Sequence, residues 1–337
     1  MKRTLKDVSI ILVTYKGDEL TKSCLQSLKQ TCGQDPQIVV VDNSPSETTR
    51  RIVASYPNAV YVPSPGNPGF AGGNNRALPF CDRDYILLLN NDTIVRSRES
   101  ILQLVSFLDD TPRCAVAQGS GRLPRSGNAL AGCGSFLTPI GFMWSPGFNS
   151  TEDPVHDQTH PCFAVSGFFM MFRRSLIKDV GGFLFRSHFW CYYEETDFCH
   201  RTWLSGNEVW YVKTIPIDHL CGATSNRFKH SEIMARHLKN LLFSLGSNLS
   251  FWSRLRILPV CKTLLLGHSL FHLLKGHIDV FKSDWAALLK SRCEKARIIV
   301  ARRQAKRMRR VSDREMFKAV LKRPPATDLF RYLRANS

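Results

Sequence analysis

The sequence lacks several features that would place the chain in a familiar class at once. Its 11 cysteines form no CxxC pair in a chain of 337 residues, which excludes a zinc ribbon and a small disulfide framework. No window reaches about 18 consecutive apolar residues, so we expect no membrane-spanning helix. The basic amino terminus is followed only by the short apolar run VSIILVTY, without a small-residue cleavage site, which argues against a signal peptide. We therefore expect a cytoplasmic protein with reduced, mostly buried thiols.

Acidic residues are scarce in the last third of the chain. Of the 46 Lys and Arg, 25 follow Ser225, but only 7 of the 28 Asp and Glu do. That segment therefore carries 25 − 7 = +18, and residues 1–225 carry 21 − 21 = 0. With 43% hydrophobic residues the chain can form a substantial core. We predict a folded domain over residues 1–225 and a basic helical region over residues 226–337.

Apolar runs and helix-spaced segments alternate along the first part of the chain. The runs at residues 8–15, 37–43, 59–64 and 85–89 predict buried strands, with helices between them. This rhythm is typical of an α/β protein with a doubly wound, mostly parallel sheet. Such sheets bind ligands at the carboxyl ends of their strands. The residues expected at that edge are Thr14, Tyr15, Asp42, Asn43, the glycine-rich loop and Asp92.

The segment YILLLNNDT, residues 85–93, ends a buried strand in four polar residues. They are Asn90, Asn91, Asp92 and Thr93. A lone carboxylate with amide neighbours suits a hard divalent cation, Mg²⁺ or Mn²⁺, that takes most of its ligands from phosphate and water. Asp92 or Thr93 could equally cap the next helix.

The segment PGNPGFAGGNNRAL contains a glycine-rich loop at residues 66–75. Four glycines and three asparagines are interleaved there. Glycines let a backbone approach a ligand closely, and a helix starting near Ala71 would offer free amides to an anion. The loop lacks the Lys-Ser/Thr pair of a Walker motif, so it does not predict an ATP site. A simple turn explains the same residues.

Carboxylates and aromatic rings concentrate in residues 188–206, HFWCYYEETDFCHRTWLSG. Glu194, Glu195 and Asp197 open a predicted helix. Acidic residues in a first turn are favoured by the helix dipole, which is a purely structural explanation. The aromatic residues before them favour a functional one, because rings can keep a carboxylate basic and can pack on a sugar. These aromatic residues are Phe189, Trp190, Tyr192 and Tyr193.

A single histidine follows the last predicted strand of the domain, in IPIDHLCGATS. His219 could be a satisfied core or surface histidine. A neutral imidazole could equally complete the coordination of a cation at Asp92.

In their order along the chain, these segments resemble the motifs of the glycosyltransferase family 2 enzymes of the GT-A fold, most closely their rhamnosyltransferase-like branch. The resemblance covers residues 7–225. It rests on VSIILVTY, VVVDNS, NPGFAGGNN, LLLNNDT, SGFFMMFRR, VGGF, YYEETDFCHR and DHLCGATS. It implies transfer of a sugar from a nucleoside diphosphate sugar to an acceptor hydroxyl, with inversion at the anomeric carbon.

The resemblance also implies a donor site. Thr14, Tyr15 and Asp42 would hold the nucleoside of a dTDP- or UDP-linked sugar, since a carboxylate can accept the imide N–H of thymine or uracil. Asn67, Gly69 and Asn74 would border the nucleotide and the donor sugar. The full set expected around the nucleotide sugar is Thr14, Tyr15, Asp42, Asn43, Asn67, Gly69, Asn74, Asn90 and Asn91.

By the same similarity, Asp92 matches the last residue of the family's DxD metal motif. His219 matches a histidine that joins the metal site in some members. The cation, Mg²⁺ or Mn²⁺, would offset charge on the departing diphosphate. The first position of the motif is Asn90 in this chain, so there are fewer anionic ligands and the ion can come and go with the nucleotide.

The resemblance places the general base at Glu195, where the family usually has aspartate. The extra methylene moves the carboxylate by roughly a bond length, and placement matters in such sites. Asp197 is the second candidate for the base. Trp190, Tyr193 and Glu194 are expected on the acceptor side.

From Asn226 onward the pattern is helical, with leucines and aromatic residues among lysines and arginines. The run ARRQAKRMRR, residues 301–310, concentrates the charge. Basic amphipathic helices lie on anionic membranes, and basic helices also bind nucleic acid. The aliphatic and aromatic content favours the membrane, and no nucleic-acid motif is present, so we expect no nucleic-acid partner.

The sequence thus predicts a metal-dependent inverting glycosyltransferase. It would move a sugar, with rhamnose as one candidate, to a glycan or lipid-linked acceptor in the synthesis of a cell-surface polysaccharide or glycolipid. It would be peripheral on the inner face of the cell membrane. The alternative is a catalytically silent protein of the same fold that binds a sugar nucleotide or a membrane. A nucleotidyltransferase would want basic residues in a glycine-rich loop after the first strand, where only Lys16 and Gly17 stand.

Overall fold

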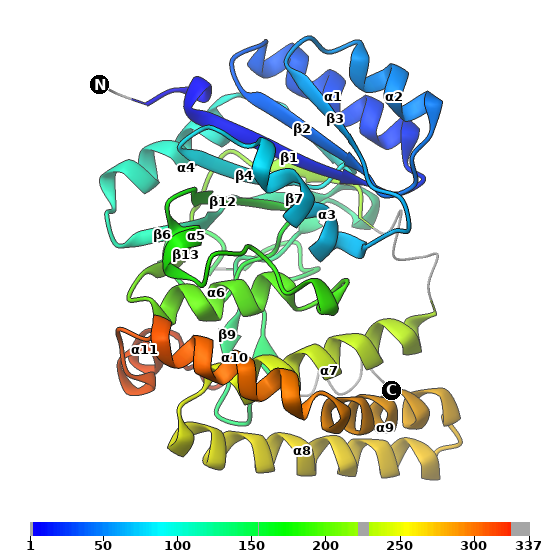
Figure 1. The fold of residues 1–337 in the computed structure, drawn as a ribbon, viewed down its shortest axis with the longest axis vertical. Helices are drawn as coiled ribbons and strands as arrows, with labels where there is room; N and C mark the ends of the chain where they lie inside the picture. Colours follow the sequence, from blue (N-terminus) through cyan, green and yellow to red (C-terminus); the bar gives the residue numbers. More distant parts are fainter. Residues whose placement is uncertain (1–2, 154, 222–228, 325–337) are drawn as a thin grey trace.

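The computed structural model describes residues 3–153, 155–221 and 229–324 (Figure 1). An eight-stranded sheet has the strand order β11-β13-β6-β12-β4-β1-β2-β3. Its strands are β1 (Val8–Thr14), β2 (Gln37–Asp42), β3 (Ala59–Pro63), β4 (Tyr85–Leu89), β6 (Cys114–Gln118), β11 (His160–Pro161), β12 (Phe169–Arg173) and β13 (Glu208–Tyr211). Strands β1 to β4 are parallel, and β12 runs antiparallel between β4 and β6. The predicted α/β fold with a mostly parallel sheet is confirmed.

The strands bury both faces, which is why they appear in the sequence as unbroken apolar runs. In β4, Leu87 and Leu89 belong to the core on one side of the sheet, and Ile86 and Leu88 to the core on the other side. Helices α1 and α4 contribute to the first core, and α3 and α6 to the second. The bounds are α1 (Asp18–Cys32), α2 (Glu47–Ala54), α3 (Gly69–Ala77), α4 (Glu99–Asp110), α5 (Leu176–Asp179) and α6 (Glu194–Leu204).

A second sheet of four short strands, in the order β5-β14-β7-β8, lies at the carboxyl end of β4. Its strands are β5 (Thr93–Ile94), β7 (Gly121–Leu123), β8 (Ala129–Leu130) and β14 (Ile217–His219). Strand β14 pairs antiparallel with β5 and sets His219 opposite Thr93. The pairing therefore brings residue 219 beside the end of β4. A further two-stranded sheet joins β9 (Phe136–Leu137) and β10 (Met143–Trp144).

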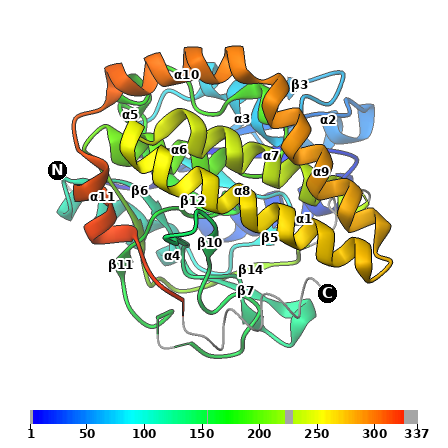
Figure 2. The same cartoon turned by 90° about the horizontal axis from the view of Figure 1, so that it is seen from below.

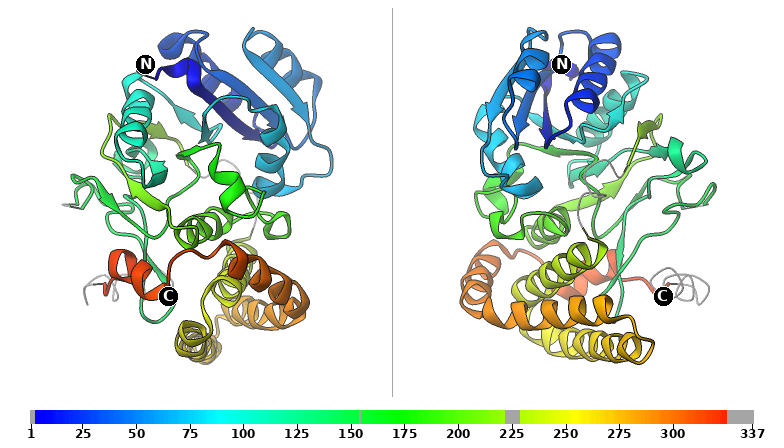
Figure 3. Two further views of the ribbon diagram at one scale, coloured as in Figure 1. Left: turned by 60° about the vertical axis from the view of Figure 1, so that its left-hand side comes forward. Right: turned by 90° about the vertical axis from the view of Figure 1, so that its right-hand side faces the viewer.

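The basic region forms helices on the side of α6 remote from the large sheet (Figures 1 and 3). They are α7 (His230–Asn248), α8 (Phe251–Leu274), α9 (Ile278–Cys293), α10 (Lys295–Met308) and α11 (Asp313–Val320). Helices α7, α10 and α11 pack against α6, and α8 and α9 pack on α7. The predicted domain boundary between residues 225 and 226 lies outside the described residues.

Helix α8 differs from the expectation that no segment could span a membrane. It is long and apolar enough to do so by length and composition, with a mean hydropathy of 1.5 over its best window and 28% of that window buried. Lysine and arginine interrupt the helix, so a search for continuous apolar runs passes over it. In the structure α8 packs along α7 and α9 and leaves its other side open (Figure 2).

Candidate functional site

Asp92 and His219 meet at the carboxyl end of β4. The Oδ1 atom of Asp92 lies 3.3 Å from Nε2 of His219, and both side chains are only slightly exposed. Asn90 Nδ2 is 3.4 Å from the same imidazole nitrogen. The imidazole stacks on Phe168, with ring centroids 4.8 Å apart and an interplanar angle of 6°. The fold therefore aims one carboxylate and one imidazole at a common point.

This donor set suits a divalent cation that brings other ligands with it. No group of three His, Cys, Asp or Glu that could hold a metal occurs among residues 3–153, 155–221 and 229–324. Asp92 and His219 supply two ligands at a separation compatible with one ion, which leaves the remaining positions for phosphate and water. The residues present therefore fit a cation that binds together with a diphosphate.

Glu195 lies in the first turn of α6 and points toward the loop before β12. A Cβ added to Gly167 in that loop would lie 4.0 Å from Oε1 of Glu195 and 3.0 Å from the ring of Phe70. Burial raises the pKa of Glu195, and the backbone N–H groups of residues 195 and 167 oppose that rise. The second carboxylate oxygen, Oε2, is buried and has no hydrogen-bond partner. A buried oxygen without a donor is ready to accept a proton.

Glu194 is the neighbour that controls the charge of Glu195. Burial and the charge of Glu195 raise the pKa of Glu194 well above its usual value. The contact between the two carboxyl groups lowers the pKa of Glu195 and raises that of Glu194. It therefore favours the proton on Glu194 and the charge on Glu195. Glu194 is only 2% exposed, so it supports Glu195 rather than facing an acceptor.

The carboxylate of Glu195 and the pair formed by Asp92 and His219 lie in the same region of the sheet edge. Gly167 contacts Glu195, and its neighbour Phe168 stacks on His219. The carbonyl of Phe168 also accepts the N–H of Asn90 at 3.1 Å. Two adjacent residues thus separate the candidate base from the candidate metal ligands, although Asp92 and Glu195 are 103 positions apart in the chain.

The turn that leads into α6 has an unusual backbone. Trp190, Tyr192 and Tyr193 have φ angles of 62°, 70° and 73°. Side chains other than glycine rarely occupy this region, and such strain persists only where neighbouring contacts hold it. The amide of Asn240, on α7, donates to the carbonyls of Phe189 at 3.1 Å and Tyr192 at 2.7 Å. Asn240 therefore fixes the turn that presents Glu195.

Trp190 connects this turn to the glycine-rich loop. Its Nε1 donates to the carbonyl of Asn67 at 2.9 Å, and its own carbonyl accepts the N–H of Ala71 at 3.0 Å. Gly69 has a φ of +74°, and a Cβ there would lie 2.1 Å from the carbonyl oxygen of Trp190. Glycine is required at position 69 because the aromatic turn, and not a ligand, occupies that space. Arg236 of α7 lies 4.1 Å over the indole ring.

Several residues predicted to hold the nucleoside use their side chains within the fold. Asp42 is fully buried and accepts from the N–H groups of Ser44 at 2.9 Å and Ser46 at 3.2 Å, and from the hydroxyl of Tyr61 at 3.1 Å. Any bond from Asp42 to a nucleobase would have to replace one of these. Tyr15, which follows the Thr14 that pairs with Asp42 across β1 and β2, remains partly exposed, with Lys16 Nζ 5.6 Å from its ring centre.

Three other residues predicted at the donor site also use their side chains for hydrogen bonds within the fold. Asn91 Nδ2 donates to the hydroxyls of Thr14 and Thr21, so residues 14 and 91 brace each other beneath the edge. Asn74 donates within α3 to the carbonyl of Phe70. Asn43 donates to the carbonyl of Gly69 at 2.9 Å and leaves its buried Oδ1 without a partner. Their backbones lie at the predicted edge, but their side chains mainly support it.

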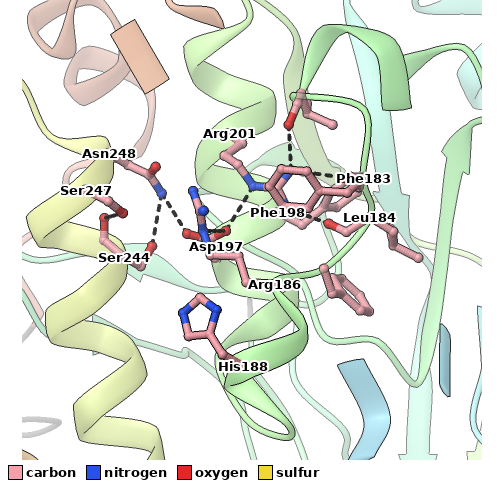
Figure 4. Close-up of polar contacts among 12 residues, drawn as sticks. Phe183, Leu184, Arg186, His188, Asp197, Phe198, Arg201, Ser244, Ser247 and Asn248 are labelled. Atoms are coloured by element: carbon pink, nitrogen blue, oxygen red, sulfur yellow. Dashed lines mark hydrogen bonds and ion pairs between the residues drawn. The ribbon is translucent and has the colours of Figure 1, made fainter. Parts of the chain in front are cut away.

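Asp197, the second candidate for the base, is the centre of a buried ion-pair cluster (Figure 4). Its Oδ2 accepts from Nε of Arg186 at 3.0 Å and of Arg201 at 2.9 Å, and its Oδ1 accepts from Asn248 at 2.8 Å. The two guanidinium groups hold the pKa of Asp197 below its usual range despite full burial. These contacts give Asp197 a structural role, so we retain only Glu195 as the candidate base.

Tyr193 does not lie where an acceptor could pack on it. Only 3% of the residue is exposed, and its ring meets that of His237 on α7 edge to face at 5.2 Å. Its prediction as an acceptor-side residue is therefore wrong. Trp190 and Tyr192 instead line a small pocket with Glu232, Ile233 and Arg236 of α7.

The sequence patterns missed the residues of α7 that hold the site, above all Asn240 and Asn248. An asparagine inside an apolar helical pattern gives no local signal of what it will contact. The only hint was that each amide falls among buried leucines, where a polar side chain needs a partner.

The fold is that of the GT-A glycosyltransferases. Residues 9–181, more than half of the chain, match the model of glycosyl transferase family 2. The chain belongs to this family.

Curated relatives extend the similarity beyond the family model. The low-salt glycan biosynthesis hexosyltransferase Agl10 of Haloferax volcanii is 28% identical over 238 residues, which cover 67% of this chain and 71% of that protein. The O-antigen chain rhamnosyltransferase WbaN of Salmonella anatum is 23% identical over 185 residues, which cover 52% of this chain and 55% of that protein.

Solved structures share the fold at low sequence identity. The mannosyltransferase PcManGT from Pyrobaculum calidifontis, solved with GDP-Man and Mn²⁺, has a TM-score of 0.53 and 15% identity, covering 86% of this chain and 88% of its own. S. aureus TarS 1–349 has a TM-score of 0.54 and 16% identity, covering 89% and 88%. At these identities the likeness shows the fold alone.

Proposed function

We propose that this protein transfers a sugar, with inversion at the anomeric carbon, from a nucleoside diphosphate sugar to an acceptor hydroxyl. The observation that carries the proposal is the convergence of Glu195 and the Asp92–His219 pair on residues 167 and 168. A base and a diphosphate site must lie close together for a single displacement, because the attacking hydroxyl and the leaving group bind opposite sides of one carbon.

Glu195 is the proposed general base. It accepts the proton of the acceptor hydroxyl as the oxygen forms its bond to the anomeric carbon and the bond to the diphosphate breaks. Burial keeps this carboxylate more basic than an exposed one, which improves proton transfer near neutral pH. The neighbouring carboxyl of Glu194 lowers the pKa of Glu195 and so favours the ionised form of the base.

Asp92 and His219 are the residues that would hold a divalent cation, Mg²⁺ or Mn²⁺. Such an ion supplies electrostatic stabilisation to a departing diphosphate. Phe168 fixes the plane of the imidazole by stacking. Asn90 Nδ2 lies 3.4 Å from Nε2 of His219, the nitrogen that would bind the ion, so it would have to give up that contact when the ion binds. Mn²⁺ accompanies GDP-Man in the PcManGT structure, which supports the assignment.

The names of the relatives support a class of donor and of product. A hexosyltransferase of glycan biosynthesis and an O-antigen rhamnosyltransferase support a hexose or deoxyhexose donor and a role in cell-surface polysaccharide or glycolipid synthesis. The proposal that the donor is dTDP- or UDP-linked rests on the resemblance of the sequence motifs. The acceptor would be a glycan or lipid-linked saccharide met at the inner face of the cell membrane. The basic helices α7 to α10 and the exposed apolar residues of α8 support peripheral attachment there.

Release of a nucleoside diphosphate tests the proposal against a catalytically silent protein of the same fold. The wild-type chain is incubated with a panel of nucleoside diphosphate sugars and Mn²⁺, with and without membrane extracts as a source of acceptor. We expect one donor to yield nucleoside diphosphate in an acceptor-dependent manner. Donor-induced thermal stabilisation without release from any donor would instead identify a binding protein.

A further inference from the structure

An open pocket lies between the start of α8 and the middle of α10, remote from the candidate active site. Its volume is about 390 Å³. The apolar side chains of Phe251, Leu255, Leu258 and Pro259 line it together with three cations, Arg254, Lys262 and Arg302. A pocket with an apolar lining and several cations matches a ligand that is itself part anion and part hydrocarbon.

The fold holds two of these cations in place by backbone carbonyls. Arg302 Nε donates to the carbonyl of Gly246 at 2.7 Å, and Arg254 Nη1 donates to that of Leu249 at 3.2 Å. Gly246, at the end of α7, lies beneath the pocket, since a Cβ there would be 3.9 Å from Leu258. Both guanidinium groups therefore approach from fixed positions and retain further N–H groups for a ligand.

The three cations have no carboxylate partner among the described residues. Within the part of the chain that the structure describes, Arg254, Lys262 and Arg302 take part in no ion pair. Burial and the neighbouring charge of Arg254 lower the pKa of Arg302. Like charges held this close favour an anion between them.

The surroundings of the pocket indicate where that anion comes from. Phe251, Leu255 and Trp252 are 58%, 57% and 76% exposed at the start of α8, and Leu274 is 88% exposed at its end. Helix α8 crosses the face of the molecule seen in Figure 2, and α9 packs beside its carboxyl-terminal part. An exposed row of large apolar side chains next to a cationic pocket favours a membrane surface over water.

We propose that this pocket binds the phosphate of an anionic glycerophospholipid, with Arg254, Lys262 and Arg302 around the phosphate and the acyl chains against Phe251 and Leu255. The inference gives a specific site to the membrane attachment in the proposed function and rests on that part of it. It does not depend on the transfer reaction. The basic run at residues 301–310 contributes to the pocket through Arg302.

Vesicle sedimentation of the full chain tests this site. The pocket variant is Arg254→Gln with Lys262→Gln, which leaves the carbonyl-bound Arg302 in place. The matched control is Arg256→Gln with Arg303→Gln, which removes the same charge from exposed positions of α8 and α10, the two helices that line the pocket. Binding is measured to phosphatidylcholine vesicles with and without phosphatidylglycerol. We expect the pocket variant to lose at least about tenfold more affinity for the anionic vesicles than the control.

Two results would overturn the proposal. Equal losses in the pocket variant and the control would mean that the helices dock by diffuse charge alone. Displacement of the protein from vesicles by glycerol 3-phosphate at millimolar concentration would mean that the pocket takes a soluble anion without acyl chains. Donor-dependent thermal stabilisation is measured on the same samples and should be unchanged in both variants, so failure of the lipid site is separate from failure of the glycosyltransferase assignment.

Discussion

The side-chain amide of Asn240 donates to the carbonyl of Tyr192 at 2.7 Å and joins helix α7 to the turn before Glu195. This contact makes the basic helical region part of the candidate active site. The same amide reaches the carbonyl of Phe189, so one side chain holds both ends of a backbone segment with positive φ angles. We expect the position of Glu195 to depend on α7.

Replacing Asn240 with alanine should therefore lower kcat by about 10–100-fold, because the turn relaxes and the carboxylate moves by a fraction of an ångström or more. KM for the donor should change less than kcat. Steady-state kinetics measure this split, and thermal denaturation checks that the protein remains folded. Ser247→Ala is the matched control on the same helix, since the Ser247 hydroxyl bonds only to the carbonyl of Ser244. Equal kinetic losses in the two variants would show that Asn240 has no positioning role.

The contact between the carboxyl groups of Glu194 and Glu195 predicts a shift in the pH dependence of activity. A base must be ionised, and burial raises the pKa of Glu195, so the acidic limb of kcat should lie above the pH typical of a free carboxylate. Glu194→Gln keeps a neutral donor and should leave this limb nearly unchanged. Glu194→Leu removes the donor, so the pKa of Glu195 should rise and the limb should move to higher pH. If the acidic limb of the kcat profile lies at the same pH in the wild type and in both variants, Glu194 does not influence the pKa of Glu195.

Asp92 is expected to couple cation and nucleotide binding. Replacing Asp92 with asparagine removes the one anionic side chain of the pair with His219, so the Mn²⁺-dependent part of nucleoside diphosphate binding should fall by about tenfold or more. Isothermal titration with and without Mn²⁺ measures it and needs no turnover. Arg96, which pairs with Asp218 on the neighbouring strand, offers a control as Arg96→Gln. Unchanged Mn²⁺ dependence in Asp92→Asn would remove Asp92 from the cation site.

Asp197 should affect stability more than chemistry. Asp197→Asn leaves two buried guanidinium groups, those of Arg186 and Arg201, without their counter-charge, and breaking such a pair costs about 3–5 kcal/mol of unfolding free energy. Because the pKa of Asp197 is lowered in the folded state, its contribution is present above the unfolded pKa and is lost as pH falls toward the folded one. Chemical denaturation measures both effects. Wild-type stability with a large loss of kcat would restore Asp197 as a candidate base.

The strands of the fold were largely predictable from the sequence. The apolar runs at 8–15, 37–43 and 85–89 correspond to β1 at Val8–Thr14, β2 at Gln37–Asp42 and β4 at Tyr85–Leu89. Burial on both faces of the sheet produces such runs directly. The direction of β12 was not predictable, because an apolar run is the same whichever way the strand lies.

The types of residue at the candidate site could be predicted from the sequence. The residues that contact them in the fold were harder to predict. Asp92 and His219 could be expected together from the resemblance, and the structure places them 3.3 Å apart. Glu195 and Asp197 both lie in an acidic first turn, so that turn alone could not show which of them is the better candidate for the base. The difference comes from Arg186 and Asn248, which only the tertiary fold brings to Asp197.

The most direct test of the account is turnover by Glu195→Gln. The substitution keeps the shape of the side chain and removes its ability to accept a proton, so kcat should fall by about 10²–10⁴-fold with donor affinity retained. Nucleoside diphosphate release measures kcat, and thermal shift with the donor measures binding. Near-normal turnover in Glu195→Gln would contradict the proposal that this carboxylate deprotonates the acceptor.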